Sequence, residues 1–157
     1  MTANFDKAFT DIVGVEGNYS NSQLDPGGET KFGISKRAYP KADIRNLTLD
    51  GAKLIYARDY WTPCHCDELQ WPLCLFVFDA AVNQGQREAV MMLQKTLGVA
   101  QDGSLGPRTL QRIATEDHAE LAALLMADRA IRYTGTRNFD LDGRGWFKRL
   151  FRIAMDA

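Results

Sequence analysis

Hydrophobic positions recur along most of the chain at helical spacing, which predicts a mainly helical fold. Residues 71–84 are apolar almost all round a helix, interrupted only by Asp79, Asn83 and Gln84. A helix of this kind is buried on every side, so we expect it to be the central helix. Other helices are predicted over 4–15, 49–60 and 87–97, from about 107, over 117–134 and from 146, with a loop at 138–145.

The pattern changes between the first and second helices. Asp25-Pro26-Gly27-Gly28 is a strong turn signal. Thr30, Phe32 and Ile34 then alternate with polar or small residues, as in a short strand. We therefore predict one small hairpin that folds back across the C-terminal end of the first helix.

Glu16 falls on the apolar face of the first helix, one turn after Ile12 and Val13. Burial and the negative end of the helix dipole would both raise the pKa of a carboxyl group there, which suits a general acid. A surface glutamate at a frayed helix end fits the same position. The hairpin would bring Asp25 and Thr30 up to face Glu16. Glycoside hydrolysis needs such a set: a protonated acid and an ionised carboxylate, with Thr30 holding the water.

The stretch 16–35 resembles the glutamate, aspartate and threonine set of phage-type lysozymes, although Thr30 lies about one residue closer to Asp25 than in that pattern. It is more similar to glycoside hydrolase family 108, the N-acetylmuramidases of phage endolysins and secretion activators. The family's Glu-Gly-Gly-aromatic motif is present as Glu16-Gly17-Asn18-Tyr19. Asn18 departs from it, and Asn accepts left-handed backbone angles better than most residues. The family pattern continues through residues 25–28 and 30–35.

This resemblance implies a mainly α (α+β, lysozyme-like) fold and a peptidoglycan hydrolase that cleaves the bond between N-acetylmuramic acid and N-acetylglucosamine. It makes Glu16 the catalytic acid, with Asp25 and Thr30 assisting, and implies lysis of the bacterial cell wall. The chemistry requires no metal and no organic cofactor. Tyr19 supplies an aromatic ring next to the acid, and we assign it to substrate binding.

Asn83 and Gln84 close the central helix, and the family has a similar Val-Asn-x-Gly ending. We therefore predict that they bind substrate sugars. Asp79 and Asn83 share a helix face, so they could instead satisfy buried backbone groups at the helix end. The aromatic residues Tyr56, Tyr60, Trp61 and Trp71 are similarly open between core packing and a cleft wall.

The second half contains an Asp-Gly-x-x-Gly-Pro-x-Thr pattern at residues 102–109. It is similar to a signature of peptidoglycan-binding modules, although turn chemistry alone can produce it. With 157 residues, the chain is expected to form a single domain, 1–157. Residues 1–85 carry the catalytic motif, and residues 86–157 form a helical half that resembles a peptidoglycan-binding region.

The net charge of −1 gives no electrostatic basis for nucleic-acid binding. Basic residues become more frequent after Arg129. They could form either a face toward the wall polymer or a solvated helix surface. Three cysteines fit a reducing compartment. The spacing of Cys64, His65 and Cys66 is not that of a common zinc site, so we predict structural cysteines, Cys74 included.

No charged leader or membrane-spanning apolar run is visible in the sequence. We therefore expect synthesis in the cytoplasm without a signal peptide or membrane insertion, and action on the cell wall or periplasm. The resemblance implies bacterial peptidoglycan as partner and a holin for export. We also expect a monomer. Three alternatives stay open: a lytic transglycosylase, which uses the substrate's own hydroxyl group in place of water, a non-catalytic peptidoglycan-binding or secretion-assisting protein, and a helical interaction protein with no role at the wall.

Overall fold

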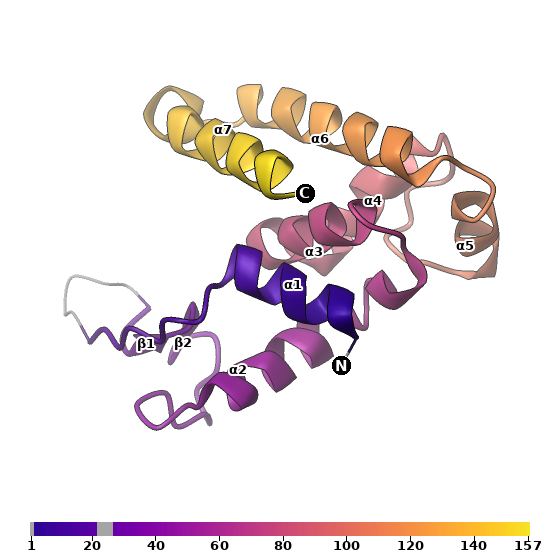
Figure 1. Cartoon of the computed structure of the whole chain (residues 1–157). Helices are drawn as coiled ribbons and strands as arrows, with labels where there is room; N and C mark the ends of the chain where they lie inside the picture. Colours follow the sequence, from indigo (N-terminus) through magenta and orange to yellow (C-terminus); the bar gives the residue numbers. More distant parts are fainter. Residues whose placement is uncertain (1, 22–26) are drawn as a thin grey trace.

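The computed structural model describes residues 2–21 and 27–157, and confirms the mainly helical fold with one small hairpin (Figure 1). A lower layer contains α1, α2 and the hairpin, α3 runs through the middle, and α6 and α7 lie above it. The elements are α1 (Ala3–Ile12), β1 (Thr30–Lys31), β2 (Ile34–Ser35), α2 (Leu49–Tyr56), its π-helical continuation η1 (Ala57–Trp61), the 3₁₀ turn η2 (Cys66–Glu68), α3 (Leu73–Gln84), α4 (Gln86–Thr96), α5 (Pro107–Ile113), α6 (His118–Thr134) and α7 (Phe139–Asp156).

α3 is the central helix, as the sequence predicts. Every residue from Leu73 to Ala81 is buried, and the helix contacts α1, α4 and α6. Gly85 ends it with a φ of 91°, and α4 begins at the next residue. The hydrophobic core of the protein is therefore organised around α3, with elements of both halves of the chain packed against it.

Aromatic rings join α1 and α2 to this core. The Trp61 ring lies edge-on to both Phe5 and Phe78, with 5.3 Å between ring centroids in each pair. Tyr56 meets Phe9 in the same way at 5.4 Å. Tyr56 and Trp61 are buried, so this part of the predicted aromatic cluster is core packing and not a cleft wall.

Local capping signals place several helix ends correctly. The hydroxyl of Thr48 accepts from the backbone N–H of Gly51 at the start of α2. The carboxylate of Asp117 accepts from Ala119 and Glu120 at the start of α6. The first helix begins one residue earlier than predicted, at Ala3, with Thr2 as its N-cap.

The predicted loop at 138–145 is wrong, because α7 already begins at Phe139. One glycine of this stretch, Gly143, has a packing role within the helix. A Cβ atom on Gly143 would lie 2.6 Å from the Phe139 ring, one turn earlier. The missing side chain lets that ring lie over the helix and meet Phe147 edge-on at 5.7 Å.

The 102–109 pattern forms a loop fastened to α4. The buried Gln94 side chain donates to the Asp102 carboxylate at 2.7 Å and to the Ser104 carbonyl at 2.9 Å. Its Oε1 atom accepts from the backbone N–H of Gly103 at 2.9 Å. These bonds give the pattern a structural role, that of holding the approach to α5. Among the described residues no helix has the length and hydropathy required to cross a membrane.

Candidate functional site

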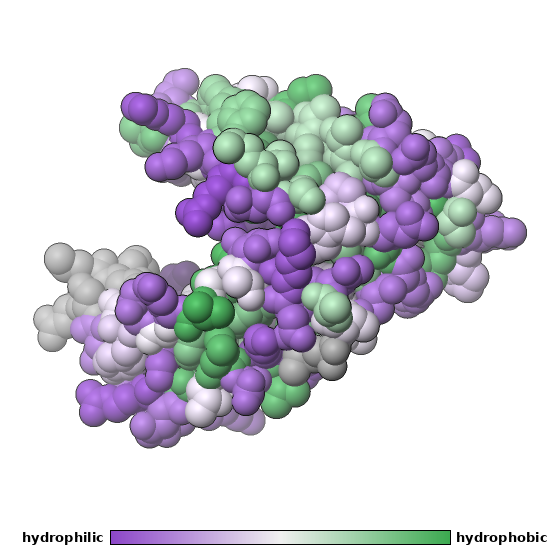
Figure 2. Space-filling model, viewed as in Figure 1, coloured by the Kyte–Doolittle hydropathy of each residue, from purple (hydrophilic) through white to green (hydrophobic). Residues whose placement is uncertain are grey.

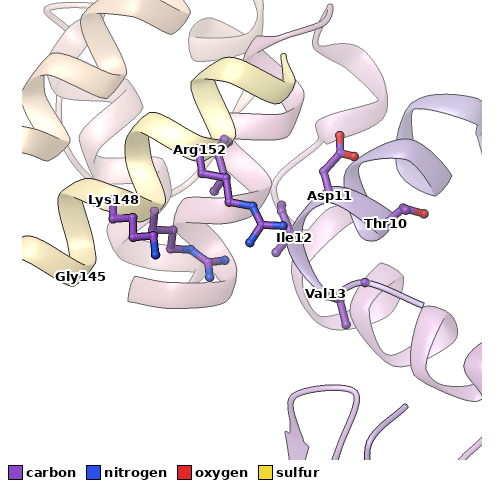
Figure 3. A pocket seen from close by; sticks show the side chains of 10 residues that line it. Thr10, Asp11, Ile12, Val13, Gly145, Lys148 and Arg152 are labelled. Atoms are coloured by element: carbon purple, nitrogen blue, oxygen red, sulfur yellow. The ribbon is translucent and has the colours of Figure 1, made fainter. Parts of the chain in front are cut away.

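A pocket of about 360 Å³ lies between the end of α1 and one face of α7 (Figure 3). Figure 2 shows the molecule hollowed on this side, between the α6–α7 layer and the layer of α1 and the hairpin, with hydrophilic side chains along both walls. One wall is residues 10–14, and the other is Gly145, Lys148, Arg149, Arg152 and Ile153. The two halves of the chain therefore form opposite walls of one pocket.

Glu16 lies two residues beyond this wall, and its side chain is exposed. The prediction that Glu16 continues the buried face of the first helix is wrong. α1 ends at Ile12, and Gly14 redirects the chain with a φ of 79°. The carboxylate of Glu16 is thus presented to solvent from an irregular segment.

Gly17 fixes this segment against the hairpin. A Cβ atom on Gly17 would overlap the Phe32 ring, which is buried. The carbonyl of Phe32 in turn accepts a hydrogen bond from the Tyr56 hydroxyl at 3.0 Å. The residue after Glu16 is therefore held, through Phe32, to the end of α2.

One small hairpin follows Glu16, as predicted, and its turn is formed by Phe32 and Gly33. The predicted turn at residues 25–28 lies partly outside the described residues. Thr30 pairs with Ser20 through two backbone hydrogen bonds of 2.8 and 2.9 Å, so the segment after Glu16 runs beside β1. The predicted single strand is instead two strands, with Lys31 opposite Ile34. Phe32 and Gly33 have φ values of 50° and 73°, the positive angles that a two-residue type I′ turn requires.

The three predicted catalytic residues are only partly placed. The Thr30 hydroxyl is half-buried and donates to the Gly28 carbonyl at 3.2 Å. Asp25 lies outside the described residues. The structure brings the segment of Glu16 and the strand of Thr30 together, and the catalytic roles of all three residues stay predictions.

Tyr19 is held on the hairpin side of this segment. Its hydroxyl donates to the Glu29 carboxylate at 2.6 Å, and the Arg45 guanidinium lies 5.6 Å from its ring centroid. Asn18 does not use the left-handed conformation expected of it, because Phe32 and His65 are the non-glycine residues with positive φ in the described chain. An Asn in place of the family's Gly therefore needs no backbone strain here.

Asn83 and Gln84 lie at the edge of an ionic network with a buried centre, which the sequence did not predict. At its centre is Asp79, whose carboxylate binds Arg129 of α6 at 2.7 Å. Arg149 of α7 donates to the same carboxylate from Nε at 2.9 Å and from Nη2 at 2.6 Å. Asn83 donates to Asp79 at 3.0 Å, and Gln84 accepts from Arg129 at 3.2 Å.

A signal for this network was present in the sequence. A charged side chain buried in an apolar helix requires an opposite charge, and the basic residues from Arg129 onward were the available partners. Asn83, Gln84 and Arg149 also line a second pocket, of about 340 Å³, between α3, α4, α6 and α7. The role of Asn83 and Gln84 in substrate binding stays a prediction. Both side chains already make hydrogen bonds within the protein.

The cysteines lie in the hydrophobic core. Cys64, Cys66 and Cys74 are buried and form no disulfide. Burial raises the pKa of Cys64 to about 12 and that of Cys74 to about 11, and raises the pKa of Cys66 as well. Such thiols are poor nucleophiles and pack as small apolar side chains.

Comparisons with known proteins match two different families to the two halves of the chain. Residues 9–85 match the family Glycosyl hydrolase 108, and residues 88–151 match a family described as "Predicted Peptidoglycan domain". No curated protein matches the chain.

The chain is also similar to a solved structure, "Structure of Brucella abortus SagA". The two share 32% identity with a TM-score of 0.82, over 96% of this chain and 91% of that one. These matches support a peptidoglycan-related function. By sequence and by fold, the chain belongs to the glycosyl hydrolase 108 family.

Proposed function

We propose that the protein is an N-acetylmuramidase, which hydrolyses the β-1,4 bond between N-acetylmuramic acid and N-acetylglucosamine in peptidoglycan. The observation that carries the proposal is the arrangement of the two matched regions. The Glu16 segment leaves α1 beside a pocket whose one wall belongs to the glycosyl hydrolase match, while α7 of the peptidoglycan-domain match forms most of the other. A glycan strand in this groove would touch both.

The chemistry assigns one step to each predicted residue. Glu16 donates its proton to the glycosidic oxygen as the bond to the muramic acid carbon breaks. Asp25 stabilises the positive charge on the sugar or orients the water, and Thr30 positions that water. The water's oxygen bonds to the sugar carbon, and its proton passes to a carboxylate. No metal or organic cofactor is required for these steps.

Because Glu16 is exposed, a bound substrate would itself cover the group that donates the proton. In the unliganded protein the carboxylate is in contact with water. A glycan strand lying over the segment would exclude that water. We place the action of the enzyme at the cell wall, with wall lysis as its outcome, after synthesis in the cytoplasm and release by a holin.

The decisive experiment is digestion of purified peptidoglycan by wild type and by Glu16→Gln, followed by analysis of reducing ends and fragment masses. The proposal expects new muramic acid reducing ends from wild type and a loss of at least about a hundredfold in rate for Glu16→Gln, the usual contribution of a general acid. Glu120→Gln is the matched control, because Glu120 is an exposed carboxylate on α6.

Two results would replace the proposal. Anhydro-muramic acid ends would show a lytic transglycosylase. Unchanged wall clearing by Glu16→Gln would favour the non-catalytic peptidoglycan-binding protein, which the peptidoglycan-domain match also supports.

A further inference from the structure

Three cations of α7 line the pocket beside Glu16, and the proposed chemistry uses none of them. Arg149 and Arg152 come one and four residues after Lys148, so the three side chains project from one side of the helix. Figure 3 shows the Lys148 and Arg152 side chains on the α7 wall, across the pocket from Ile12 and Val13 of the first helix. We name this set the α7 cation cluster.

The cluster keeps an excess of positive charge. Arg149 binds Asp79, but that carboxylate also binds Arg129, so one negative charge faces two positive ones. Arg152 is 79% exposed and lies 4.0 Å from Asp156. Lys148 has no ion pair among residues 2–21 and 27–157. The acid on the facing wall, Asp11, already lies 3.6 Å from Lys7.

Arg149 is also oriented before any ligand arrives. Two of its nitrogens bind the same oxygen of Asp79, whose side chain is fully buried. The Arg149 side chain itself stays 36% exposed and lines the pocket. A guanidinium fixed in this way loses little entropy when it binds an anion.

Under the proposed function, the anion has an identifiable source. The sugar backbone of peptidoglycan is neutral at its glycosidic core, whereas each peptide stem carried by muramic acid has free carboxylates. Gly14, at the edge of the pocket, is two residues from Glu16, so a stem on the muramic acid next to the cleaved bond lies within reach. Guanidinium and ammonium groups bind carboxylates through charge-assisted hydrogen bonds.

We propose that the α7 cation cluster binds the carboxylates of the peptide stem, and so makes the enzyme selective for stem-bearing muramic acid over bare glycan. The inference rests on the proposed function for the identity of the substrate. It makes Lys148, Arg149 and Arg152 specificity residues, with the buried Asp79 positioning Arg149.

The test measures binding of two ligands made from one preparation: soluble glycan oligomers with their peptide stems, and the same oligomers after an amidase has removed the stems. Amidase cleavage leaves one lactyl carboxylate on each muramic acid, so the second ligand lacks only the carboxylates of the stem itself. All proteins carry Glu16→Gln, so that nothing is hydrolysed during the measurement. The variant Lys148→Gln with Arg152→Gln removes two charges that have no buried partner. Its charge-matched control is Arg108→Gln with Arg137→Gln, since both residues are exposed and neither lines the pocket.

We expect the α7 double variant to weaken binding of stem-bearing oligomers by about tenfold, in proportion to two lost charge contacts. Binding of the stem-free oligomers should weaken less, because only the lactyl carboxylates remain on them. The control should match the parent on both ligands. Added salt should reduce the difference between the two ligands. Equal weakening on both ligands, an equal effect of the control, or no preference of the parent for stems would each overturn the inference.

Failure of the proposed function looks different. If the protein with Glu16 intact hydrolyses neither oligomer, the muramidase proposal fails, while the binding comparison still decides whether the cluster recognises stems.

Discussion

At the scale of single residues, the site depends on the glycine at position 17 as much as on the side chains around it. Gly17 lets the chain after Glu16 lie directly on the Phe32 ring. Phe32 itself has a positive φ of 50°, which is unusual for a bulky residue. The burial of its ring, and the hydrogen bond from Tyr56 to its carbonyl, offset that strain.

Gly17→Ala should therefore displace Phe32 and lower the free energy of unfolding by about 1–3 kcal/mol, as overpacking does. The position of Glu16 should shift with it, so activity on peptidoglycan should fall further than stability. Denaturant unfolding and the digestion assay measure the two effects.

Gly145→Ala is the control, because a Cβ atom on Gly145 meets nothing within 4 Å. In the interior of α7 it should stabilise the protein by about 0.5–1 kcal/mol. If both alanines have the same effect on stability, close packing on Phe32 is not what requires Gly17.

The cysteines give a second prediction at this scale. Because burial raises the pKa of Cys64 and Cys74 to about 12 and about 11, the native thiols should not react with a thiol-specific reagent at pH 8. All three cysteines should react in guanidinium chloride. Rapid reaction of the folded protein would contradict the burial.

The raised pKa values of these thiols determine how the stability of the protein changes with pH. The ordinary thiol pKa is 9.0, below the values in the folded protein. The unfolded state therefore loses its protons first. The thiol contribution to stability is complete below pH 9 and is lost as the pH rises toward the folded-state pKa values. Replacing Cys64 by Ala should make unfolding less sensitive to pH in this alkaline range.

At the scale of elements, one carboxylate holds three helices together. Asp79 of α3 binds Arg129 of α6 and Arg149 of α7, and Asp79 and Arg129 are fully buried. Asn83 adds a hydrogen bond from the last turn of α3. This network spans the boundary between the two family matches and includes Arg149 of the α7 pocket wall.

Arg129→Met should lower the free energy of unfolding by about 3–5 kcal/mol, because it leaves part of a buried charge uncompensated. Arg132→Met is the matched change on α6, where the arginine pairs with Glu88 at the surface. It should cost less than about 1 kcal/mol. Equal losses in thermal or denaturant unfolding would mean that the Asp79 pair contributes no more than a surface ion pair.

At the scale of the whole molecule, the two matched regions share one core. The buried face of α3 from the first region is covered by α4 and α6 of the second. A chain of residues 1–85 would therefore expose α3 to water. We therefore expect the protein to fold as one unit.

We expect the fragment 1–85 to lack a cooperative thermal transition and near-ultraviolet circular dichroism, whereas the full chain melts in a single step. The fragment 86–157 should behave like 1–85. A cooperative transition in either fragment would show that the regions are independent domains.

Much of the fold could be predicted because local signals decided it. The apolar run of α3 and the caps Thr48 and Asp117 each act over a few residues. The sequence also pointed to Glu16 by its motif. It misplaced the end of α1 and the start of α7, where Gly14 breaks a helix and Gly143 does not. Gly14 adopts a positive φ of 79°, whereas Gly143 stays helical and leaves room for the Phe139 ring.

The sequence by itself determined the helical class of the protein, the central helix, the hairpin after Glu16 and the residues of the family motif. These follow from periodicity, capping and turns, which are properties of neighbouring residues. Only the tertiary structure decided that Glu16 is exposed, that Arg129 and Arg149 share Asp79, and that α7 forms the wall facing α1. Asp79 and Arg149 are far apart in the chain, and no local pattern specifies which charges meet when the core closes.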